Sequence, residues 1–310
     1  MSVEVAISNV TLGTGEGPHW DETTNSLVFV DITEHNVYRW DSITGIVDKK
    51  HLDDDDEVGC IVPCKKGGFL VAVGRNIVHL DWSTQKQARL HEIPPKGVAN
   101  RFNDGKCDPA GRLWIGTMGK VLSFDPLEFE MEKGDLYCLD TDGSLHKRLE
   151  KLTVSNGLAW SSDHKTMYFI ESVPGQIMAF DYDVTTGNIC NKRTVLDIGK
   201  FDPNDPECLG IPDGMTIDTD DNIWVAFYGG GHVICLNPKT GEMLRKIEIP
   251  CKRTTSCCFG GENLDELFVT TSEAGSTEEE RKKYPDSGKV FKVKGLGVKG
   301  HPANVFKGNL

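Results

Sequence analysis

The sequence lacks any apolar run long enough to cross a lipid bilayer. Its longest apolar stretches, such as Ser26–Asp31, span only a few residues, whereas a membrane-spanning helix needs about 20. Positive charge is also in deficit, because 34 Lys and Arg residues face 47 Asp and Glu residues and leave a net charge of −13. Such a field repels nucleic acids and anionic membranes. We therefore expect neither a nucleic-acid partner nor a membrane partner.

The sequence also has few features of a secreted or histidine-zinc protein. Glu4 lies close to the N-terminus, and no basic stretch precedes an apolar core, so we expect a cytoplasmic protein without a secretory leader. The ten cysteines are thinly spread over 310 residues, which favours buried free thiols over a disulfide framework. The nine histidines show neither H-x-H nor H-E-x-x-H spacing, which argues against a zinc site built from histidines.

Short strand-like segments instead recur along the whole chain. Six of them share a pattern in which a short apolar strand is followed by an acidic turn and an aromatic-rich strand. They begin at Gly17, Gly59, Gly105, Gly157, Gly214 and Ser256. Successive starts are 42, 46, 52, 57 and 42 residues apart, close to the 40–50 or so residues of a four-stranded propeller blade. The pattern predicts an all-β fold, a six-bladed β-propeller that forms a single domain over residues 1–310.

A few segments fall outside the six repeats. Val3–Ile7 has no blade of its own, so we expect it to complete the last blade and close the ring. Residues 276–283 predict a short helix in blade six, with Ser276 and Glu279 as a capping box. Insertions at 119–133 and 200–211 are predicted to separate blades three and four and blades four and five. The first insertion lies after the second strand of blade three, where a loop can cover the channel mouth as a substrate lid.

Acidic and amide side chains occupy matched positions at the starts of the predicted inner strands. The residues that precede the opening glycines are Glu16, Val58, Asp104, Asn156 and Asp213, and Asn103 is adjacent. Because the first strand of every blade lines the channel, these oxygen-bearing side chains should converge on the axis. Asn, Asp and Glu before Gly also form turns. Four such residues at the same position of the repeat, however, favour a binding site for Ca²⁺, Mg²⁺ or Mn²⁺, and these donors are less characteristic of a Zn²⁺ site.

The same segments resemble the gluconolactonase, regucalcin (senescence marker protein) and luciferin-regenerating enzyme family. The resemblance is carried by residues 15–20, 100–118, 155–161, 212–218 and 255–261. It implies a six-bladed propeller with one divalent cation (Ca²⁺, Mg²⁺, Mn²⁺ or Zn²⁺) in the central channel. By position, it implies Glu16, Asn156 and Asp213 as metal ligands, Asp213 also as the catalytic acid and base, and Arg101 and Asn103 as substrate contacts.

The resemblance implies a metal-dependent hydrolase of the lactonase type, acting on a small-molecule substrate, and we expect a monomer. Two alternatives stay open, a luciferin-regenerating enzyme acting on oxyluciferin and a non-catalytic calcium-binding regulator. The family's acidic substrate contact has no match in this chain, because Met118 is followed by Gly119-Lys-Val-Leu122. We expect a less polar channel mouth. Its polar candidates are Arg101, Asn103, Lys120 and His232, and its apolar ones are Phe102, Leu122, Phe124 and Tyr228.

Overall fold

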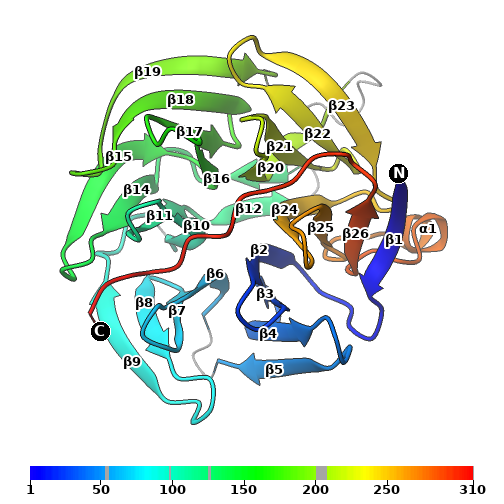
Figure 1. Cartoon of the computed structure of the whole chain (residues 1–310), viewed down its shortest axis with the longest axis horizontal. Coiled ribbons are helices and arrows are strands. Elements are labelled where there is room, and N and C mark those ends of the chain that lie inside the picture. The colour runs from blue at the N-terminus through cyan, green and yellow to red at the C-terminus, as the bar shows by residue number, and fades with distance from the viewer. Residues whose placement is uncertain (53–55, 98, 125–126, 200–207, 310) are drawn as a thin grey trace.

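Six four-stranded antiparallel sheets surround a central channel in the computed structural model of the protein (Figure 1). The structure describes residues 1–52, 56–97, 99–124, 127–199 and 208–309. The predicted all-β, six-bladed propeller is thereby confirmed. Most of the predicted insertion at 200–211 lies outside the described residues.

The blades are numbered in chain order, and the strands of each blade run from the innermost to the outermost. Blade one contains β2 (Gly15–Asp21), β3 (Ser26–Asp31), β4 (Asn36–Asp41) and β5 (Val47–His51). Blade two contains β6 (Val58–Pro63), β7 (Phe69–Val73), β8 (Asn76–Leu80) and β9 (Gln87–Glu92). Blade three contains β10 (Arg101–Cys107), β11 (Leu113–Met118), β14 (Gly134–Leu139) and β15 (Leu145–Leu152).

The second half of the ring repeats this order. Blade four contains β16 (Ser155–Trp160), β17 (Thr166–Glu171), β18 (Gln176–Asp183) and β19 (Asn188–Asp197). Blade five contains β20 (Ile211–Ile217), β21 (Ile223–Tyr228), β22 (His232–Asn237) and β23 (Glu242–Glu248). Blade six contains β24 (Thr254–Gly260), β25 (Glu266–Thr271), β26 (Val290–Lys294) and β1 (Ser2–Ile7).

Strand β1 closes the ring as the sequence predicts. It pairs antiparallel with β26, with Val3 opposite Val293 and Val5 opposite Phe291. The last blade is therefore built from both ends of the chain. The edge of β26 is paired within the molecule and is unavailable to other chains.

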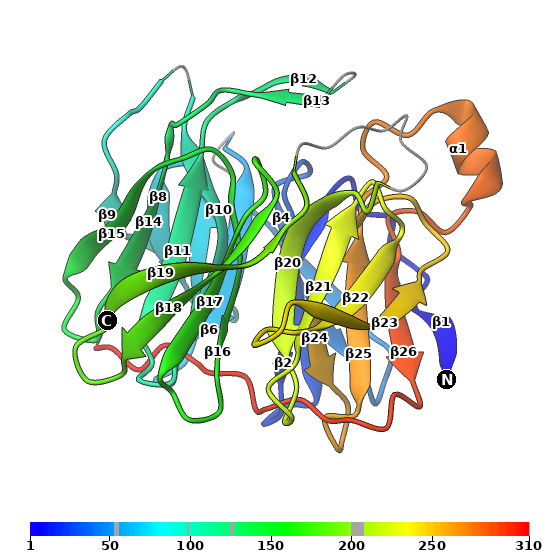
Figure 2. The same cartoon turned by 90° about the horizontal axis from the view of Figure 1, so that it is seen from above.

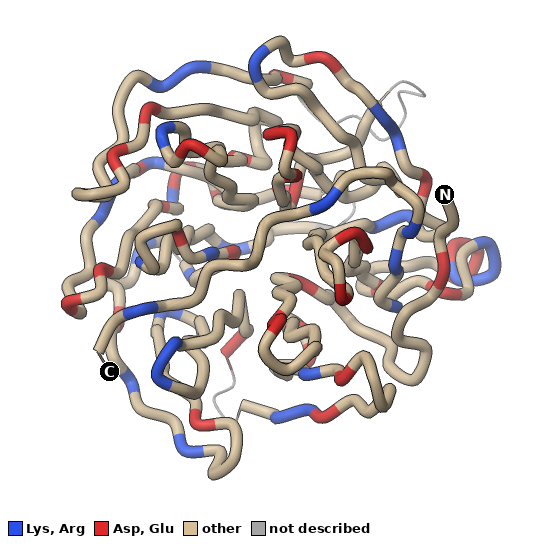
Figure 3. The backbone as a smooth tube through the Cα atoms, viewed as in Figure 1, with Lys and Arg blue, Asp and Glu red and all other residues tan. Residues whose placement is uncertain are grey.

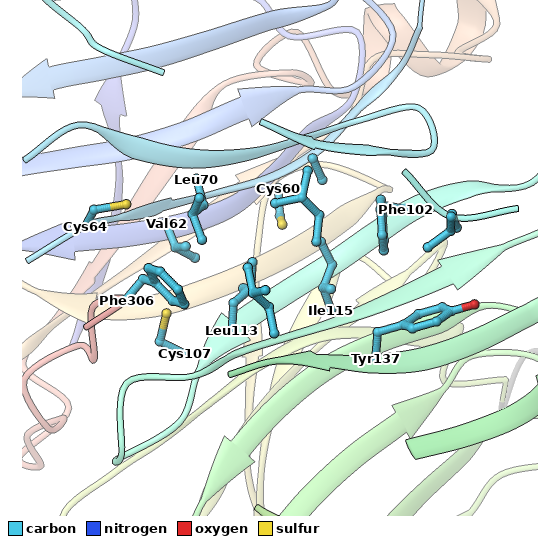
Figure 4. Packing of buried hydrophobic residues seen from close by; sticks show 14 residues of the cluster. Cys60, Val62, Cys64, Leu70, Phe102, Cys107, Leu113, Ile115, Tyr137 and Phe306 are labelled. Atoms are coloured by element: carbon cyan, nitrogen blue, oxygen red, sulfur yellow. The ribbon is translucent and has the colours of Figure 1, made fainter. Parts of the chain in front are cut away.

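The apolar core lies between neighbouring blades. Second strands such as β3, β7 and β11 are buried along their whole length, because each packs between two adjacent sheets. Figure 4 shows the cluster between blades two and three, where Cys60 and Leu70 face Phe102 and Ile115. All ten cysteines are free and eight are buried, which confirms the predicted free thiols.

The outermost strands, such as β5 and β23, are mostly exposed. Lysine, arginine, aspartate and glutamate are interspersed along them (Figure 3). Among the described residues, no helix has the length and apolar character needed to span a membrane.

The inner strands share an irregularity that aims their side chains. The pairing of each with its second strand shifts register near the strand start, for example between Glu16 and His19 in β2 and between Pro212 and Met215 in β20. Such bulges redirect side chains. The glycines after the entry positions permit close packing, because a Cβ on Gly214 would lie 1.9 Å from Ser256 Oγ.

Two predicted details are wrong. The helix α1 (Glu278–Lys283) begins later than expected, because Thr277 accepts from the Glu280 backbone N–H and forms the capping box instead of Ser276 with Glu279. The insertion at 119–133 does not separate blades three and four, but it does lie after the second strand of blade three, as the lid hypothesis expects. It forms a hairpin of β12 (Val121–Phe124) and β13 (Leu127–Phe129) between β11 and β14, within blade three.

The C-terminal segment, residues 295–309, crosses one end of the channel and is called the strap, and this end is the strap face (Figures 1 and 2). The Gly300 backbone N–H donates to the Leu264 carbonyl, and the Phe306 N–H donates to the Pro63 carbonyl. The Phe306 ring is 1% exposed and belongs to the core between blades two and three. The strap thus ties blade six to blade two. The β12–β13 hairpin lies at the opposite end, the hairpin face (Figure 2).

Candidate metal centre and substrate pocket

The inner strands bring the predicted site residues together at the hairpin face of the channel. Glu16 comes from β2, Asn103 from β10, Asn156 from β16 and Asp213 from β20. Their side chains are buried, with exposed fractions of 5–8%. All four line one pocket with Arg101. The predicted convergence is therefore present for Glu16, Asn156 and Asp213, whereas Asp104, predicted at the same phase, does not line the pocket and the adjacent Asn103 does.

Hydrogen bonds fix the orientation of the two amides. Asn103 Nδ2 donates to the Ser155 carbonyl at 3.0 Å and to Asn156 Oδ1 at 3.4 Å. Asn156 Nδ2 donates to Ser172 Oγ at 2.9 Å, and that hydroxyl donates to the Pro212 carbonyl at 2.7 Å. This series of hydrogen bonds links β10, β16 and β20, so each strand helps to fix the polar side chains of its neighbours.

The carboxyl groups repel one another in a site remote from solvent. Burial and the nearby Asp104 raise the pKa of Glu16 to about 8. Burial, Glu16 and Asp104 raise the pKa of Asp213 well above its ordinary value, and a hydrogen bond between the Glu16 and Asp213 side chains acts in the same direction. Burial also raises the pKa of Asp104. The metal-free site thus favours protons on its carboxyl groups.

A divalent cation fits this donor set. Two carboxyl groups and an amide oxygen are hard donors of the kind that Ca²⁺, Mg²⁺ and Mn²⁺ take, and a cation would relieve the repulsion that raises the two pKa values. Within the described ranges, no three His, Cys, Asp or Glu side chains form a cluster able to hold an ion. Asn156 is therefore needed beside the two carboxylates, and Asp104 instead accepts from the Gly105 N–H at 2.7 Å.

Arg101 is held rigidly at the edge of the pocket. Its Nε pairs with the Glu57 carboxylate, and its Nη1 donates at 2.8 Å to both the Phe102 carbonyl and Asn103 Oδ1. The guanidinium and the Asn103 amide therefore face the pocket as one polar unit. The sequence did not predict that Glu57 positions Arg101. The matched position in blade two is the apolar Val58, so the pattern gave no signal for a polar residue there.

The remainder of the pocket is largely apolar. The cavity has a volume of about 130 Å³ and is lined in part by the β12–β13 hairpin. Its apolar lining comes from Ile32, Met118, Val121, Leu127, Phe129, Val154, Ile211 and Tyr228. The hairpin contributes three of these residues, so the insertion covers the channel mouth as expected.

Several predicted mouth residues lie elsewhere. Phe102 is fully buried and packs edge-on against Tyr137, with ring centroids 6.1 Å apart. His232 is buried beside Phe227. Leu122 is 57% exposed, and neither it nor Lys120 lines the pocket. The side chain of Phe124 is outside the described set. Of the predicted mouth residues, Arg101, Asn103 and Tyr228 line the pocket.

Known proteins resemble this chain along nearly its whole length. A family model described as SMP-30/Gluconolactonase/LRE-like region matches residues 14–273. Regucalcin of Gallus gallus is 42% identical over 294 residues, 95% of each chain, and regucalcin of Homo sapiens is 42% identical over 286 residues, 92% of each chain.

Solved structures show the same architecture. A luciferin-regenerating enzyme superposes with a TM-score of 0.89 at 34% identity, over 99% of both chains. A calcium-binding regucalcin from Agrobacterium tumefaciens gives a TM-score of 0.87 at 24% identity, covering 98% of this chain and 97% of that one. A gluconolactonase from Xanthomonas campestris gives 0.67 at 22% identity, covering 96% and 89%. The last two show likeness of fold.

Proposed function

Because the chain belongs to the SMP-30/gluconolactonase/LRE-like family, we propose that it is a divalent-metal-dependent hydrolase that opens lactone rings. The observation that carries the proposal is the contact between two buried carboxyl groups, Glu16 and Asp213, beside the Asn156 amide. These three side chains would hold the cation. The adjoining pocket offers both polar and apolar walls to a substrate.

The polar residues of the pocket have distinct roles in ring opening. A bound cation would supply Lewis acidity toward an ester carbonyl. Asp213 takes a proton from the attacking water, whose oxygen bonds to the carbonyl carbon. Asp213 then returns that proton to the ring oxygen as the C–O bond breaks. Arg101 donates hydrogen bonds to substrate oxygens and orients the ring. Asn103 contacts the substrate beside it and holds the guanidinium through its Oδ1.

The substrate pocket suits lactones with few hydroxyl groups. A sugar lactone needs a polar partner for each buried hydroxyl, whereas Met118, Val121, Leu127 and Phe129 supply none from their side chains. We therefore propose that δ-valerolactone is hydrolysed with a higher kcat/KM than gluconolactone.

The test starts from protein stripped of metal by a chelator. Hydrolysis of both lactones is followed by acid release before and after separate addition of Ca²⁺, Mg²⁺, Mn²⁺ and Zn²⁺. We expect metal-dependent turnover that favours δ-valerolactone. A preference for gluconolactone would contradict the substrate proposal alone. Stoichiometric calcium binding without turnover of either lactone would contradict the hydrolase and favour a regulator.

A further inference from the structure

A second cavity, of about 320 Å³, lies at the strap face of the channel. It is lined by the later residues of the inner strands, such as His19, Lys106 and Phe259. The metal-centre pocket takes the earlier residues of the same strands, and the two linings have no residue in common. Glu16 and His19 pair with Val30 and Val28, which are two positions apart on β3, so the two residues are separated by about 7 Å along the strand. The second cavity is therefore a separate compartment.

The strap forms part of the cavity wall. Residues 301–304 line it, and the chain is anchored on either side by the backbone hydrogen bonds of Gly300 and Phe306. Ser162 Oγ and His301 Nε2 lie 3.0 Å apart and join the strap to blade four. The strap thus shapes a cavity of a size usual for small-molecule sites.

His19 presents unused hydrogen-bonding capacity to this cavity. The residue is 7% exposed and lines the wall. In the part of the chain that the structure describes, its ring has no hydrogen-bond partner. Burial lowers the pKa of His19 to about 4, so the neutral ring offers one donor and one acceptor.

Lys106 supplies a positive charge beside His19. Its Nζ donates to the Met215 carbonyl at 2.6 Å, and among the described residues no carboxylate lies within ion-pair distance of it. The charge of Lys106 contributes to the lowered pKa of His19, which places the two side chains near each other. An ammonium group retains further donors after one hydrogen bond. The cavity therefore offers charge-assisted binding to an anion.

Apolar groups complete the wall. Ile217 and Phe259 come from β20 and β24, and Pro302 from the strap. A small inorganic anion would leave these surfaces unfilled, whereas an organic acid uses both parts of the wall.

We propose that the strap-face cavity binds a small monocarboxylate with an apolar body, whose carboxylate meets Lys106 and His19 and whose body packs against Ile217, Phe259 and Pro302. This site shares no residue with the metal centre, although the charge of Lys106 also lowers the pKa values of Glu16 and Asp104. The proposal does not rest on the proposed hydrolase activity.

The test uses the full chain loaded with Ca²⁺ and titrated calorimetrically with benzoate, with benzamide as the uncharged isostere. We expect benzoate to bind and benzamide to bind roughly tenfold more weakly or worse, since a hydrogen bond between charged groups is lost. Lys106→Met should weaken benzoate by a similar factor. Lys299→Met is the matched control, because it removes the same charge from a strap position outside the cavity lining and should leave benzoate affinity unchanged.

A second measurement does not depend on variants of the cavity. Benzoate should shift the imidazole NMR signals of His19 and His301 in the wild-type protein, and Asp213→Asn should retain the same benzoate affinity. Equal binding of benzamide, loss of benzoate binding in Asp213→Asn, or no heat and no His19 shift at millimolar benzoate would each overturn the proposal. Failure of lactone hydrolysis would leave it standing.

Discussion

The Asp213 carboxyl group lies beside that of Glu16 at a depth where solvent does not screen their repulsion. In the proposed reaction Asp213 both holds the cation and moves the proton. Asp213→Asn keeps the size and an oxygen donor but removes the charge. We expect weaker Ca²⁺ binding by calorimetry and a fall in kcat of about 10²-fold or more. Asp265→Asn, at an exposed position, is the control and should change neither quantity.

The raised pKa of Glu16 also makes the stability of the metal-free protein depend on pH. The pKa of Glu16 is 4.5 in the unfolded chain and about 8 in the folded protein. At pH values between the two, the folded protein holds a proton on Glu16 that the unfolded chain releases, so the free energy of unfolding falls as pH rises. The lowered pKa of His19 acts oppositely, but only between about 4 and 6.5.

Between pH 6.5 and 8 the contribution of His19 is absent, and the pH dependence comes from Glu16 together with Asp213, whose pKa is also raised. There we expect urea denaturation to show decreasing stability with rising pH in metal-free protein. Glu16→Gln should make this slope shallower, and the buried Asp213 carboxyl should retain part of it. Bound Ca²⁺ should abolish it, because the cation displaces the protons. A metal-free protein whose stability is constant across this window would contradict the assignment.

At the scale of secondary-structure elements, the β12–β13 hairpin can be removed with little disturbance to its base. The Glu130 N–H donates to the Lys120 carbonyl at 2.9 Å, so Asn-Gly can replace residues 121–129 as a two-residue turn. The ligand strands β2, β16 and β20 are untouched. We expect unchanged Ca²⁺ affinity and a kcat/KM for δ-valerolactone lower by about tenfold. Loss of calcium binding would instead assign the hairpin a structural role.

The inner strands were predictable from sequence because their constraint is local. Five of the six carry a glycine at the matched position, and at Gly157 and Gly214 the neighbouring strands approach too closely for a Cβ. In blades one, four and five the residue before this glycine lines the pocket. Glu16, Asn156 and Asp213 follow from that rule together with the family resemblance.

The pocket walls were not predictable in the same way. Phe129 and Val121 reach the pocket only because the hairpin folds over the mouth. The path of a loop depends on tertiary contacts, and these do not follow from the repeat pattern of the sequence. Phe102 alternates inward on β10 and enters the interblade core instead.

At the scale of the whole molecule, the strap joins blades that are distant in sequence. Phe306 inserts between blades two and three, so Phe306→Ala should lower the free energy of unfolding by about 3–5 kcal/mol. Leu122→Ala, at an exposed position, should stay within about 0.5 kcal/mol of the wild type. Urea denaturation measures both. A Phe306→Ala protein as stable as the wild type would mean that the strap does not stabilise the ring.

The pairing of β1 with β26 has a consequence for folding. The two strands are about 290 residues apart in the chain, and such non-local pairing is slow. During that time β1 is an unpaired strand, and the unfinished blades expose apolar faces that favour aggregation. Completion of the ring therefore waits for Val290–Lys294, which must be present and folded before β1 can pair.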